Sequence, residues 1–486
     1  MDRSSRIYGS APEVVLALAL LLVLAVACGP EEETGQAGRT GGDTGIEAGT
    51  APSDERPNVI LILADDLDGS VFRRSTLGSS WTSEGTSFTN ALVTTSLCCP
   101  SRASIFRGQY AHNTGLVSNL NKDPGGGARF FRESGLEDQT LATLLQDEGY
   151  ETWFGGKYLN GYEEAGGWEG QVPPGWDHWQ AYLDESVVNR DGTVVGFDDH
   201  YTDWLSGEAA RYIEGRQGSS PPFFMQVSTM DTHTPLVIPG RHQNAYPDAR
   251  APRPPSFNEA DVSDKPAWVR AKDPLRKREV ARFDRLQALR MRSALTLEDL
   301  SRDVVSALSR TDQLEDTYLI FTSDNGYHMG IHRIRGAKWT PYTEAHEVPL
   351  VVRGPGVPAD ESFDELVANT DIAPTVLDLA GSSPPGWMDG RTFVPFLDGE
   401  APDTWRSSLL IEGVGGTYYD RPGYAGVRRE DEVFVEYSTG DTEYYDLVRD
   451  PYQLENRPED APQGIEGDLK ALKSCSGDAC REAEGP

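Results

Sequence analysis

The feature that most constrains the fold of this chain is a series of short, continuously apolar runs that lead into acidic, amide or imidazole side chains. Such runs, without polar alternation, are typical of strands buried on both faces of a parallel sheet. The runs and the polar residues after them are 59–63 with Asp65 and Asp66, 318–322 with Asp324 and Asn325, 223–227 with His233, and a fourth run within 348–356. A buried central sheet is therefore expected.

Helical patterns separate these runs along the chain. Apolar residues recur at helical spacing in 138–150, 296–311 and 370–381. Strands that alternate with helices indicate a wound α/β domain, in which the ligand crevice lies beyond the carboxyl ends of the strands. The polar residues that end the runs are therefore expected to meet at one edge of the sheet.

The last part of the chain has a different pattern. From about residue 401, short strand patterns alternate with turn residues, which predicts a small antiparallel sheet. These patterns lie in 407–413, 424–430, 432–438 and 443–450. The expected organisation is a signal peptide in 1–27, a flexible tether in 28–56, a main α/β domain in 57–400 and a C-terminal α+β subdomain in 401–486.

The N-terminus predicts export. Arg3 and Arg6 precede an apolar run, 14–27, that is shorter than the roughly 20 residues a transmembrane helix needs. Small residues end this run directly before Cys28, which resembles a bacterial lipoprotein signal in which Cys28 becomes lipidated. Simple secretion with cleavage before Cys28 is the alternative. Residues 29–56 have too little apolar surface to fold, so we expect them to be a flexible tether. The whole protein is then expected to be an extracytoplasmic lipoprotein.

The net charge limits the partners of the chain. Its 77 acidic and 44 basic residues give a formal charge of −33. Such a surface repels nucleic acid and anionic membranes, so no nucleic acid is expected and membrane contact is expected only through the lipid anchor. An anionic substrate would need basic groups gathered locally in a pocket. Solubility or salt adaptation is the simpler explanation of the charge.

The five cysteines fall into three groups. Cys28 is the expected anchor, and Cys475 and Cys480 are expected to form a small disulfide loop in an oxidising compartment. Cys98 and Cys99 are adjacent, and neighbouring residues rarely bond because a disulfide needs Cα atoms about 4.4–6.8 Å apart. One of them therefore has another role, or is a small buried side chain. The following sequence predicts a helix start, where an anion is stabilised.

The stretch CCPSR, residues 98–102, resembles the C-x-P-S-R signature of type I sulfatases, with Cys98 as its cysteine and Cys99 in the variable position. The other matching elements are ADD at Asp65 and Asp66, GGKYLNGY at Lys157, THTP at His233, SDNG at Asp324 and Asn325, RGAKWTPY at Lys338, and EYYDLVRDPYQLENR at 443–457. The resemblance covers roughly 56–456. It implies an alkaline-phosphatase-like fold, a wound mixed α/β sheet flanked by helices with a smaller C-terminal antiparallel-sheet subdomain.

The resemblance also implies a chemistry. In that family a separate formylglycine-generating enzyme oxidises the cysteine, here Cys98, to Cα-formylglycine. One hydroxyl of its hydrate attacks the sulfur of a sulfate ester, and the second then expels sulfate and restores the aldehyde. An unmodified cysteine or serine cannot perform that last step.

Family roles can be carried over to individual residues. The implied metal ligands are Asp65, Asp66, Asp324, Asn325 and the modified Cys98. An all-oxygen site favours Ca²⁺, with Mg²⁺ as the alternative. The implied catalytic residues besides Cys98 are Arg102, Lys157, His233 and Lys338. His233 is the residue expected to protonate the leaving alcohol, and Lys338 is the alternative.

Two departures from the family pattern bear on the substrate. Leu159 stands where many sulfatases have a substrate-contacting histidine, and Thr343 stands where glutamate is usual. The form GKYLN is similar to that of N-acetylglucosamine-6-sulfatases and extracellular heparan endosulfatases. A 6-O-sulfated N-acetylglucosamine is therefore the expected substrate, with Asn160, His112 and His328 as candidate contacts, although His112 could equally be a supporting residue.

Two other functions remain compatible with these motifs. A phosphonate monoesterase or phosphodiesterase of the same superfamily would share the fold and the aldehyde. A non-catalytic, surface-anchored glycan-binding lipoprotein would share only the scaffold, and the full set of expected catalytic residues argues against it.

Overall fold

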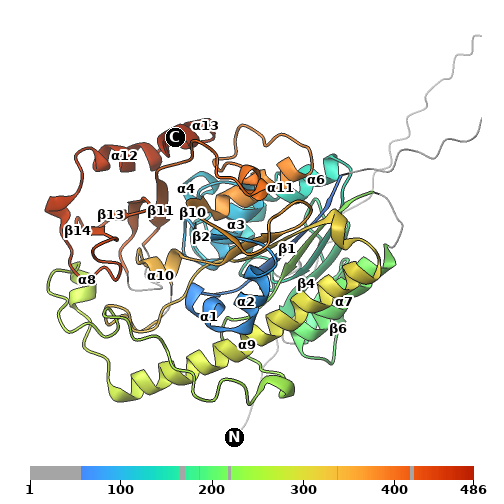
Figure 1. Cartoon of the computed structure of the whole chain (residues 1–486), viewed down its shortest axis with the longest axis horizontal. Helices are drawn as coiled ribbons and strands as arrows, with labels where there is room; N and C mark the ends of the chain where they lie inside the picture. The colour runs from blue at the N-terminus through green and yellow to red at the C-terminus, as the bar shows by residue number, and fades with distance from the viewer. Residues whose placement is uncertain (1–55, 165–169, 185, 217–220, 337, 416–420) are drawn as a thin grey trace, which may run out of the picture. The chain divides into compact units, whose positions relative to one another are not determined.

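The computed structural model describes residues 56–486, except 165–169, 185, 217–220, 337 and 416–420 (Figure 1). The predicted signal peptide, Cys28 and nearly all of the predicted tether lie outside the described residues. Within the described part of the chain, no helix is both long enough and apolar enough to cross a membrane. The described residues form one compact unit.

A ten-stranded mixed sheet forms the centre of this unit, in the order β10-β2-β9-β8-β1-β7-β3-β4-β5-β6. Its central strand is β1 (Asn58–Ala64), which pairs in parallel with β7 (Phe223–Ser228) and β8 (Thr317–Ser323). The other strands are β2 (Thr86–Leu92), β3 (Glu151–Gly156), β4 (His178–Asp184), β5 (Val187–Arg190), β6 (Thr193–Gly196), β9 (Leu350–Arg353) and β10 (Glu361–Ala368). The predicted wound α/β class is confirmed.

Not every apolar run forms a parallel strand. The runs that become β1, β7 and β8 are parallel, as is the pairing of β3 with both β7 and β4. The run in 348–356 forms β9, which is antiparallel to both β8 and β2. Both faces of β9 are nonetheless covered, so its composition resembles that of its parallel neighbours, and its direction depends on the connection before it.

Helices cover both faces of the sheet. Alternate residues of β1 enter two different apolar clusters, because successive side chains of a strand point to opposite faces. Val59, Leu61 and Leu63 pack with one cluster. Ile60 and Ile62 pack with the other. The helices are α1 (Gly69–Arg74), α2 (Thr76–Thr82), α3 (Cys98–Arg107), α4 (Ala111–Thr114), α5 (Gly127–Glu133), α6 (Leu141–Asp147), α7 (Tyr201–Gly215), α8 (Ala267–Arg270), α9 (Lys277–Arg310), α10 (Thr343–His346), α11 (Ile372–Leu379), α12 (Ile465–Leu472) and α13 (Asp478–Ala483).

The long helix α9 differs from its prediction. The apolar pattern predicts a helix only over 296–311, whereas the structure continues it back to Lys277. The added half is rich in arginine, and its inward face carries the buried side chains of Phe283, Gln287 and Met291 at helical spacing. Because polar Gln287 belongs to that stripe, the apolar periodicity alone does not reveal the first half of the helix.

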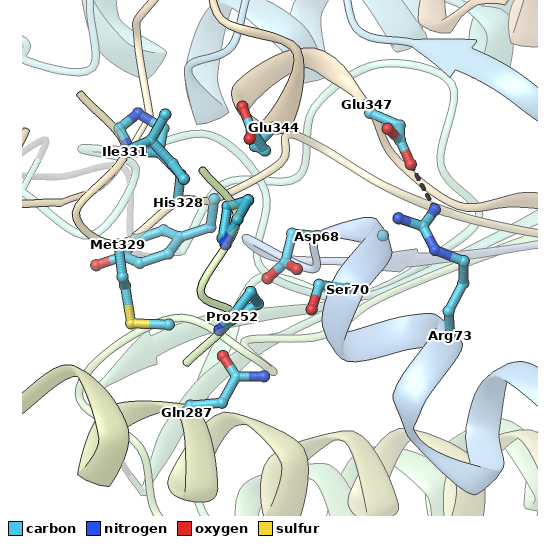
Figure 2. Close-up of a pocket in the computed structure, with 13 residues that line it drawn as sticks. Asp68, Ser70, Arg73, Pro252, Gln287, His328, Met329, Ile331, Glu344 and Glu347 are labelled. Atoms are coloured by element: carbon cyan, nitrogen blue, oxygen red, sulfur yellow. Dashed lines mark hydrogen bonds and ion pairs between the residues drawn. The ribbon is translucent and has the colours of Figure 1, made fainter. Parts of the chain in front are cut away.

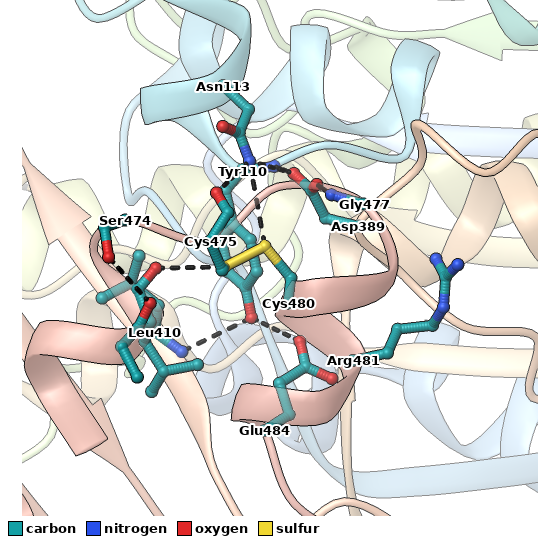
Figure 3. The surroundings of a disulfide bond; sticks show 12 residues. Tyr110, Asn113, Asp389, Leu410, Ser474, Cys475, Gly477, Cys480, Arg481 and Glu484 are labelled. Carbon is teal, nitrogen blue, oxygen red and sulfur yellow. Dashed lines mark hydrogen bonds between the residues drawn. A yellow bond between two sulfur atoms is a disulfide. The ribbon is translucent and has the colours of Figure 1, made fainter. Parts of the chain in front are cut away.

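The C-terminal part forms a separate four-stranded antiparallel sheet, as predicted. Its strands are β11 (Leu409–Gly413), β12 (Tyr424–Arg428), β13 (Glu432–Tyr437) and β14 (Thr442–Asp446). After them, the predicted disulfide joins Cys475 to Cys480 (Figure 3). Beside the disulfide, the hydroxyl of Tyr110 donates to Glu484 at 2.6 Å, which ties the last helix to the main domain (Figure 3).

Candidate active site

The polar residues that end the apolar runs meet at one edge of the sheet, as predicted. Asp65 and Asp66 follow β1, Asp324 follows β8, and Lys157 follows β3. One ligand atom from each of Asp65, Asp66, Asp324 and Cys98 lies within 4.8 Å of all the others. This set, together with Asn325, Arg102, Lys157 and Lys338, is called the reaction centre below.

Cys98 reaches this edge as the first residue of α3. Its Sγ lies 3.5 Å from Oδ1 of Asp65 and 2.7 Å from Nζ of Lys338. The side chain is fully buried, and burial raises the pKa of the thiol despite the nearby charges of Lys157 and Lys338. The neighbouring Cys99 packs instead into the apolar cluster on one face of the sheet, as expected for the variable position.

Each carboxylate of the reaction centre contacts a cation. Nζ of Lys157 lies 2.5 Å from Oδ2 of Asp65, and Nζ of Lys338 donates to Asp66. Nε of Arg102 donates to Asp324 at 2.8 Å, with both side chains fully buried. Burial favours the neutral form of Asp65, but Lys157 and the other cations outweigh it and hold the pKa of Asp65 below its usual range. For Asp324, burial and the charge of Asp65 prevail over Arg102 and raise the pKa.

The donor set fits a hard divalent cation. Three carboxylates converge there, and the amide of Asn325 donates to Asp66 at 2.6 Å. The amide oxygen of Asn325 is buried and has no hydrogen-bond partner among the described residues. Buried polar atoms are rarely left unpaired, so this oxygen is available as a ligand. Carboxylate and amide oxygens favour Ca²⁺ or Mg²⁺.

The backbone of Asp66 is held in a left-handed conformation, with φ at 61°. Its carbonyl oxygen accepts from Arg290 of α9, and its N–H donates to Oδ1 of Asp324 at 3.1 Å. Arg290 also contacts Oδ2 of Asp68 at 2.8 Å and is almost completely buried. No sequence pattern indicates the role of Arg290, because nothing in the sequence distinguishes it from the other arginines of α9.

His233 stands at the open side of the reaction centre. It follows β7, and its Nε2 lies 3.8 Å from Oδ2 of Asp66. Its side chain is 30% exposed, whereas those of Asp66, Lys157 and Lys338 are nearly inaccessible. A ligand that enters from solvent can therefore contact His233 before the buried groups.

Two of the predicted substrate contacts lie in different surroundings. Asn160 lies within the Lys157 motif, and its side-chain oxygen is buried without a hydrogen-bond partner among the described residues. His328 is buried, and its Nε2 lies at hydrogen-bond distance, 3.1 Å, from Oγ1 of Thr340. Burial disfavours the charged form of His328 and strongly lowers its pKa. It lines a pocket together with Asp68 and Glu344 (Figure 2).

The structure does not bring His112 together with the reaction centre. Its Nδ1 lies 3.1 Å from a carboxylate oxygen of Glu412, and its Nε2 lies 3.1 Å from the carbonyl oxygen of Cys475. Both ring nitrogens are thus engaged beside the disulfide, which corrects the grouping of His112 with the substrate contacts and favours its supporting role. The adjacent sulfurs of Cys475 and Cys480 are bonded to each other, so they offer no thiolate to a metal.

Comparison with known proteins identifies the family of this chain. The family model described as Sulfatase matches residues 57–382. The chain belongs to the sulfatase family. A second model, described as N-sulphoglucosamine sulphohydrolase, C-terminal, matches 332–471. This sulfatase is therefore a sulfuric ester hydrolase, and its reaction centre lies within the matched part of the chain.

Relatives with sulfatase names match most of this chain. The N-acetylglucosamine-6-sulfatase of Capra hircus is 34% identical over 91% of this chain and 87% of the relative. That of Homo sapiens is 33% identical over 90% of this chain and 87% of the relative. The extracellular sulfatase SULF-1 homolog of Drosophila melanogaster is 31% identical over 74% of this chain but only 33% of its own length.

Solved structures confirm the fold. BT4656 in complex with its substrate D-glucosamine-2-N,6-O-disulfate has a TM-score of 0.71, with 21% identity over 89% of this chain and all of that chain. The phosphonate monoester hydrolase SpPMH from Silicibacter pomeroyi has a TM-score of 0.64, with 21% identity over 86% of this chain and 94% of that chain.

Proposed function

We propose that this sulfatase removes the 6-O-sulfate from N-acetylglucosamine units of sulfated carbohydrate, with Cys98 as the precursor of formylglycine. The observation that carries the proposal is the position of Cys98, which begins α3 beside three carboxylates and in contact with Lys338. The Cys99 side chain, by contrast, is packed in the core. Formylglycine at Cys98 would supply an oxygen nucleophile that can be regenerated after each turnover.

Two lysines would neutralise the sulfate. Lys157 follows β3 and Lys338 lies in the loop between β8 and α10, and both are buried near Cys98. Burial would lower the pKa of each lysine, but the adjacent carboxylates outweigh burial and raise it, so both remain charged. Preorganised positive charge in a buried site stabilises the charge that develops on sulfuryl oxygens in the transition state.

Arg102 and His233 would have different tasks. Arg102 is fully buried, and its guanidinium donates to Asp324 and to the carbonyl oxygen of Lys157 at 2.7 Å. It therefore positions a metal ligand and a lysine at once. His233 is the more exposed group, so it is placed to give a proton to the departing sugar oxygen. A divalent cation held by Asp65, Asp66, Asp324 and Asn325 would polarise the nucleophile and one sulfuryl oxygen.

The substrate assignment has two supports. The relatives named N-acetylglucosamine-6-sulfatase cover nearly the whole chain. In addition, Leu159, which replaces the usual histidine, is buried in an apolar cluster and offers no polar contact to a substrate. The nearby Asn160 provides a neutral donor and acceptor, which suits a sugar hydroxyl or acetamido group.

The proposal is tested on purified protein from a host that has the maturation enzyme. Conversion of Cys98 to formylglycine lowers the mass of its peptide by about 18 Da. Sulfate release is then compared among 6-O-sulfated N-acetylglucosamine, 4-O-sulfated N-acetylgalactosamine and a simple aryl sulfate. A clear preference for the 6-sulfate is expected. Equal or better release from the 4-sulfate would contradict the substrate assignment.

A second activity is supported by one neighbour. The fold is shared with a phosphonate monoester hydrolase, and a buried cluster of cations does not by itself distinguish sulfate from phosphonate esters. Matched aryl sulfate and aryl phosphonate esters separate the two activities. We expect the sulfate ester to react faster, and a higher kcat/KM for the phosphonate would assign the chain to the second activity.

We also propose that the enzyme is exported and anchored through a lipid on Cys28. The support is the sequence before Cys28, an apolar run shorter than a membrane span that ends in small residues. Cys28→Ser should move the protein from the membrane fraction to the soluble fraction or block its processing. A variant that stays membrane-bound like the parent would contradict the anchor.

A further inference from the structure

The exposed face of the first half of α9 is basic, in a chain whose formal charge is −33. Residues 276–292 contain seven basic and two acidic side chains, a local excess of five positive charges. We propose that this face binds an extended chain of sulfated polysaccharide outside the reaction centre. The inference rests on the proposed function, because it concerns the polymer that would carry the scissile sulfate.

Four arginines form a stripe along α9, called the arginine stripe below: Arg278, Arg282, Arg285 and Arg292. Their spacing of four, three and seven residues places them on one face of the helix, over a length of about 21 Å. The first three are exposed, and Arg292 is half-buried. Helical positions three or four residues apart lie about 5–6 Å from each other, less than the Debye length of about 8 Å at physiological salt. The charges of the stripe therefore act together on a polyanion.

A groove runs beside the arginine stripe. It lies between α9 and the segment 247–250. Arg285 and Arg292 line the groove from the helix, and Arg250 lines it from the segment. Nε of Arg292 also donates to the carbonyl oxygen of Ala245 at 2.6 Å, which holds the chain before this segment against the helix. Arginines thus line the groove from two elements, as binding of an extended anion requires.

Most cations of this face lack a partner, although acidic residues outnumber basic ones in the chain by 77 to 44. Exposed arginines elsewhere commonly pair with a carboxylate, as Arg310 does with Glu214 at 2.5 Å. Four arginine side chains of this face form no hydrogen bond or ion pair with another described residue, namely those of Arg250, Arg278, Arg282 and Arg285. Their donors are available to a ligand.

The carboxylates nearest to the stripe are already paired with other arginines. Asp284 contacts Arg253 at 2.5 Å, and Glu279 contacts Arg335 at 2.7 Å. Asp248 is the other carboxylate among the described residues of the groove, and it is exposed. The positive charge of the stripe is therefore not cancelled locally. A planar guanidinium can donate two parallel hydrogen bonds to the oxygens of one sulfate group.

The surroundings favour sulfated polysaccharide over other polyanions. None of the described residues that line the groove is aromatic, whereas single-stranded nucleic acid is usually held by stacking its bases on aromatic rings. The apolar face of α9, which includes Phe283 and Met291, is buried in the main domain and is not available to enter a lipid surface. Closely spaced charges along an open groove suit a carbohydrate chain that carries sulfates along its length.

The helix α9 also connects the arginine stripe with the reaction centre. It packs beside α1, which follows β1 (Figure 1). Arg290 points inward from α9 and contacts Asp66 and Asp68, whereas Arg285 and Arg292 line the groove on the outer side. A helix with its side chains is about 10–12 Å across. A polymer in the groove would be held on the order of one helix diameter from the reaction centre, which raises the local concentration of its sulfated ends there.

The first experiment measures binding without turnover. Cys98→Ala protein is titrated with a heparin fragment that spans the stripe, at several concentrations of sodium chloride. The stripe variant combines Arg278→Gln, Arg282→Gln and Arg285→Gln. Its affinity at low salt should fall at least about tenfold, and the slope of log K against log salt should become shallower by about two, because three contacts that release counterions are lost. An unchanged affinity and slope would overturn the inference.

The matched control removes three exposed arginines elsewhere and changes the net charge equally. It combines Arg310→Gln, Arg449→Gln and Arg457→Gln, and each of these arginines pairs with a carboxylate. Its affinity for the heparin fragment should fall less than about twofold, because a paired surface charge contributes little to binding a further anion. An equal loss in the control and the stripe variant would show that only net charge matters and would contradict the docking surface.

The second experiment tests the choice of polyanion. Single-stranded DNA of the same length should bind at least about tenfold more weakly than heparin at equal salt, because the groove offers no aromatic ring for stacking. The stripe variant should bind vesicles that contain phosphatidylserine as well as the wild type does. Tighter binding of DNA, or a loss of vesicle binding in the stripe variant, would assign the stripe to another partner and overturn the inference.

The third experiment measures turnover by enzyme with formylglycine at Cys98. For a sulfated polysaccharide that ends in 6-O-sulfated N-acetylglucosamine, the stripe variant should have a KM at least about fivefold higher with kcat unchanged. For the monosaccharide, kcat/KM should stay within about twofold of the wild type, because the stripe binds the chain and not the reacting ester. This second result also shows that the variant is folded.

The outcomes separate this inference from the proposed function. An unchanged KM for the polymer, or an equal loss of kcat/KM on the polymer and the monosaccharide, would overturn the docking surface. If the wild type with formylglycine at Cys98 releases no sulfate from either substrate, the proposed function is wrong, and the binding experiment alone then decides the role of the stripe.

Discussion

Two buried polar clusters of the enzyme differ in how completely their atoms are paired. One is the reaction centre. The other, called the Glu443 cluster, consists of Glu443 and the hydroxyls of Tyr342, Tyr437 and Tyr445. There, one oxygen of Glu443 accepts from Tyr342 at 3.1 Å and Tyr445 at 2.6 Å, and the other accepts from Tyr437 at 2.5 Å.

The protonation of the two clusters differs accordingly. Burial raises the pKa of Glu443, and the surrounding hydroxyls do not compensate. In the reaction centre, burial also favours neutral Asp65, but Lys157 and its neighbouring cations prevail and lower the pKa. The reaction centre keeps buried atoms that have no partner among the described residues, including Nη2 of Arg102 and the amide oxygen of Asn325.

Pairing and protonation together distinguish a structural polar cluster from a functional one within this chain. The Glu443 cluster satisfies its acceptor with neutral donors and needs nothing further, whereas the reaction centre holds charge and unpaired atoms that a metal and a sulfate would satisfy. Only three residues separate Lys338 in one cluster from Tyr342 in the other. Substitutions should therefore affect catalysis in the first and stability in the second.

The largest effect is expected at Cys98. Cys98→Ala should lower sulfate release at least about 10³-fold, because it removes the proposed precursor of the nucleophile. Cys99→Ala is the matched control and should keep most of the activity, at a stability cost for the lost packing. Steady-state rates on 6-O-sulfated N-acetylglucosamine measure both. An active Cys98→Ala enzyme would reassign the nucleophile.

The next effect concerns the proposed metal ligands. Asp324→Asn should lower kcat at least about 100-fold and reduce the divalent metal retained after dialysis, because it removes a carboxylate and leaves Arg102 without its anion. A chelator should do the same to the wild type. Asp147→Asn, at an exposed position of α6, is the control. Full activity and unchanged metal content in Asp324→Asn would show that Asp324 does not bind the metal.

In the Glu443 cluster a smaller effect is expected, and it should lower stability rather than activity. Glu443→Ala leaves three buried hydroxyls without an acceptor and should lower the free energy of unfolding by about 3 kcal/mol. Glu443→Gln, which retains one carbonyl acceptor, should cost less. Denaturant unfolding measures the stability, and kcat per folded molecule should stay within about threefold of the wild type. A large loss of kcat without a loss of stability would erase the distinction between the clusters.

The smallest effect tests the link between the clusters. His346 is buried, with Nε2 2.9 Å from the hydroxyl of Tyr424 and 3.4 Å from Oγ of Ser96. Tyr424 in turn packs beside Tyr437 of the Glu443 cluster, with ring centroids 6.3 Å apart. Burial lowers the pKa of His346 from 6.5 to about 4, so the folded ring stays neutral where the unfolded ring binds a proton.

The contribution of His346 to the free energy of unfolding should therefore be complete above pH 6.5. It should decline as the pH falls from 6.5 toward 4, because only the unfolded state takes up the proton in that window. The contribution of His346 is about 1 kcal/mol between pH 6.5 and 5.5. Denaturant unfolding at both pH values measures it. His346→Gln should reduce this dependence, and an identical dependence in the variant would assign it to other groups.

Several parts of the molecule follow from the sequence alone. The apolar runs of β1, β7 and β8 form buried strands because each is continuous and short, and the residues after them meet because parallel strands end at one edge. The five-residue separation of Cys475 and Cys480 likewise permits their disulfide. Cys98 could be separated from Cys99 because the spacing to Pro100 and Arg102 is local and does not depend on the rest of the fold.

Other features depend on contacts between distant segments. Asp66 and Arg290, 224 residues apart, meet only when α9 packs beside the first strand. The antiparallel direction of β9, the place of His112 beside the disulfide, and the lining of one pocket by both Tyr201 and His233 also arise from packing. Local periodicity determines which residues are strand or helix and which face is buried. The tertiary structure decides which buried cation meets which carboxylate and what surrounds the leaving group, because those partners come from elements that no local pattern relates.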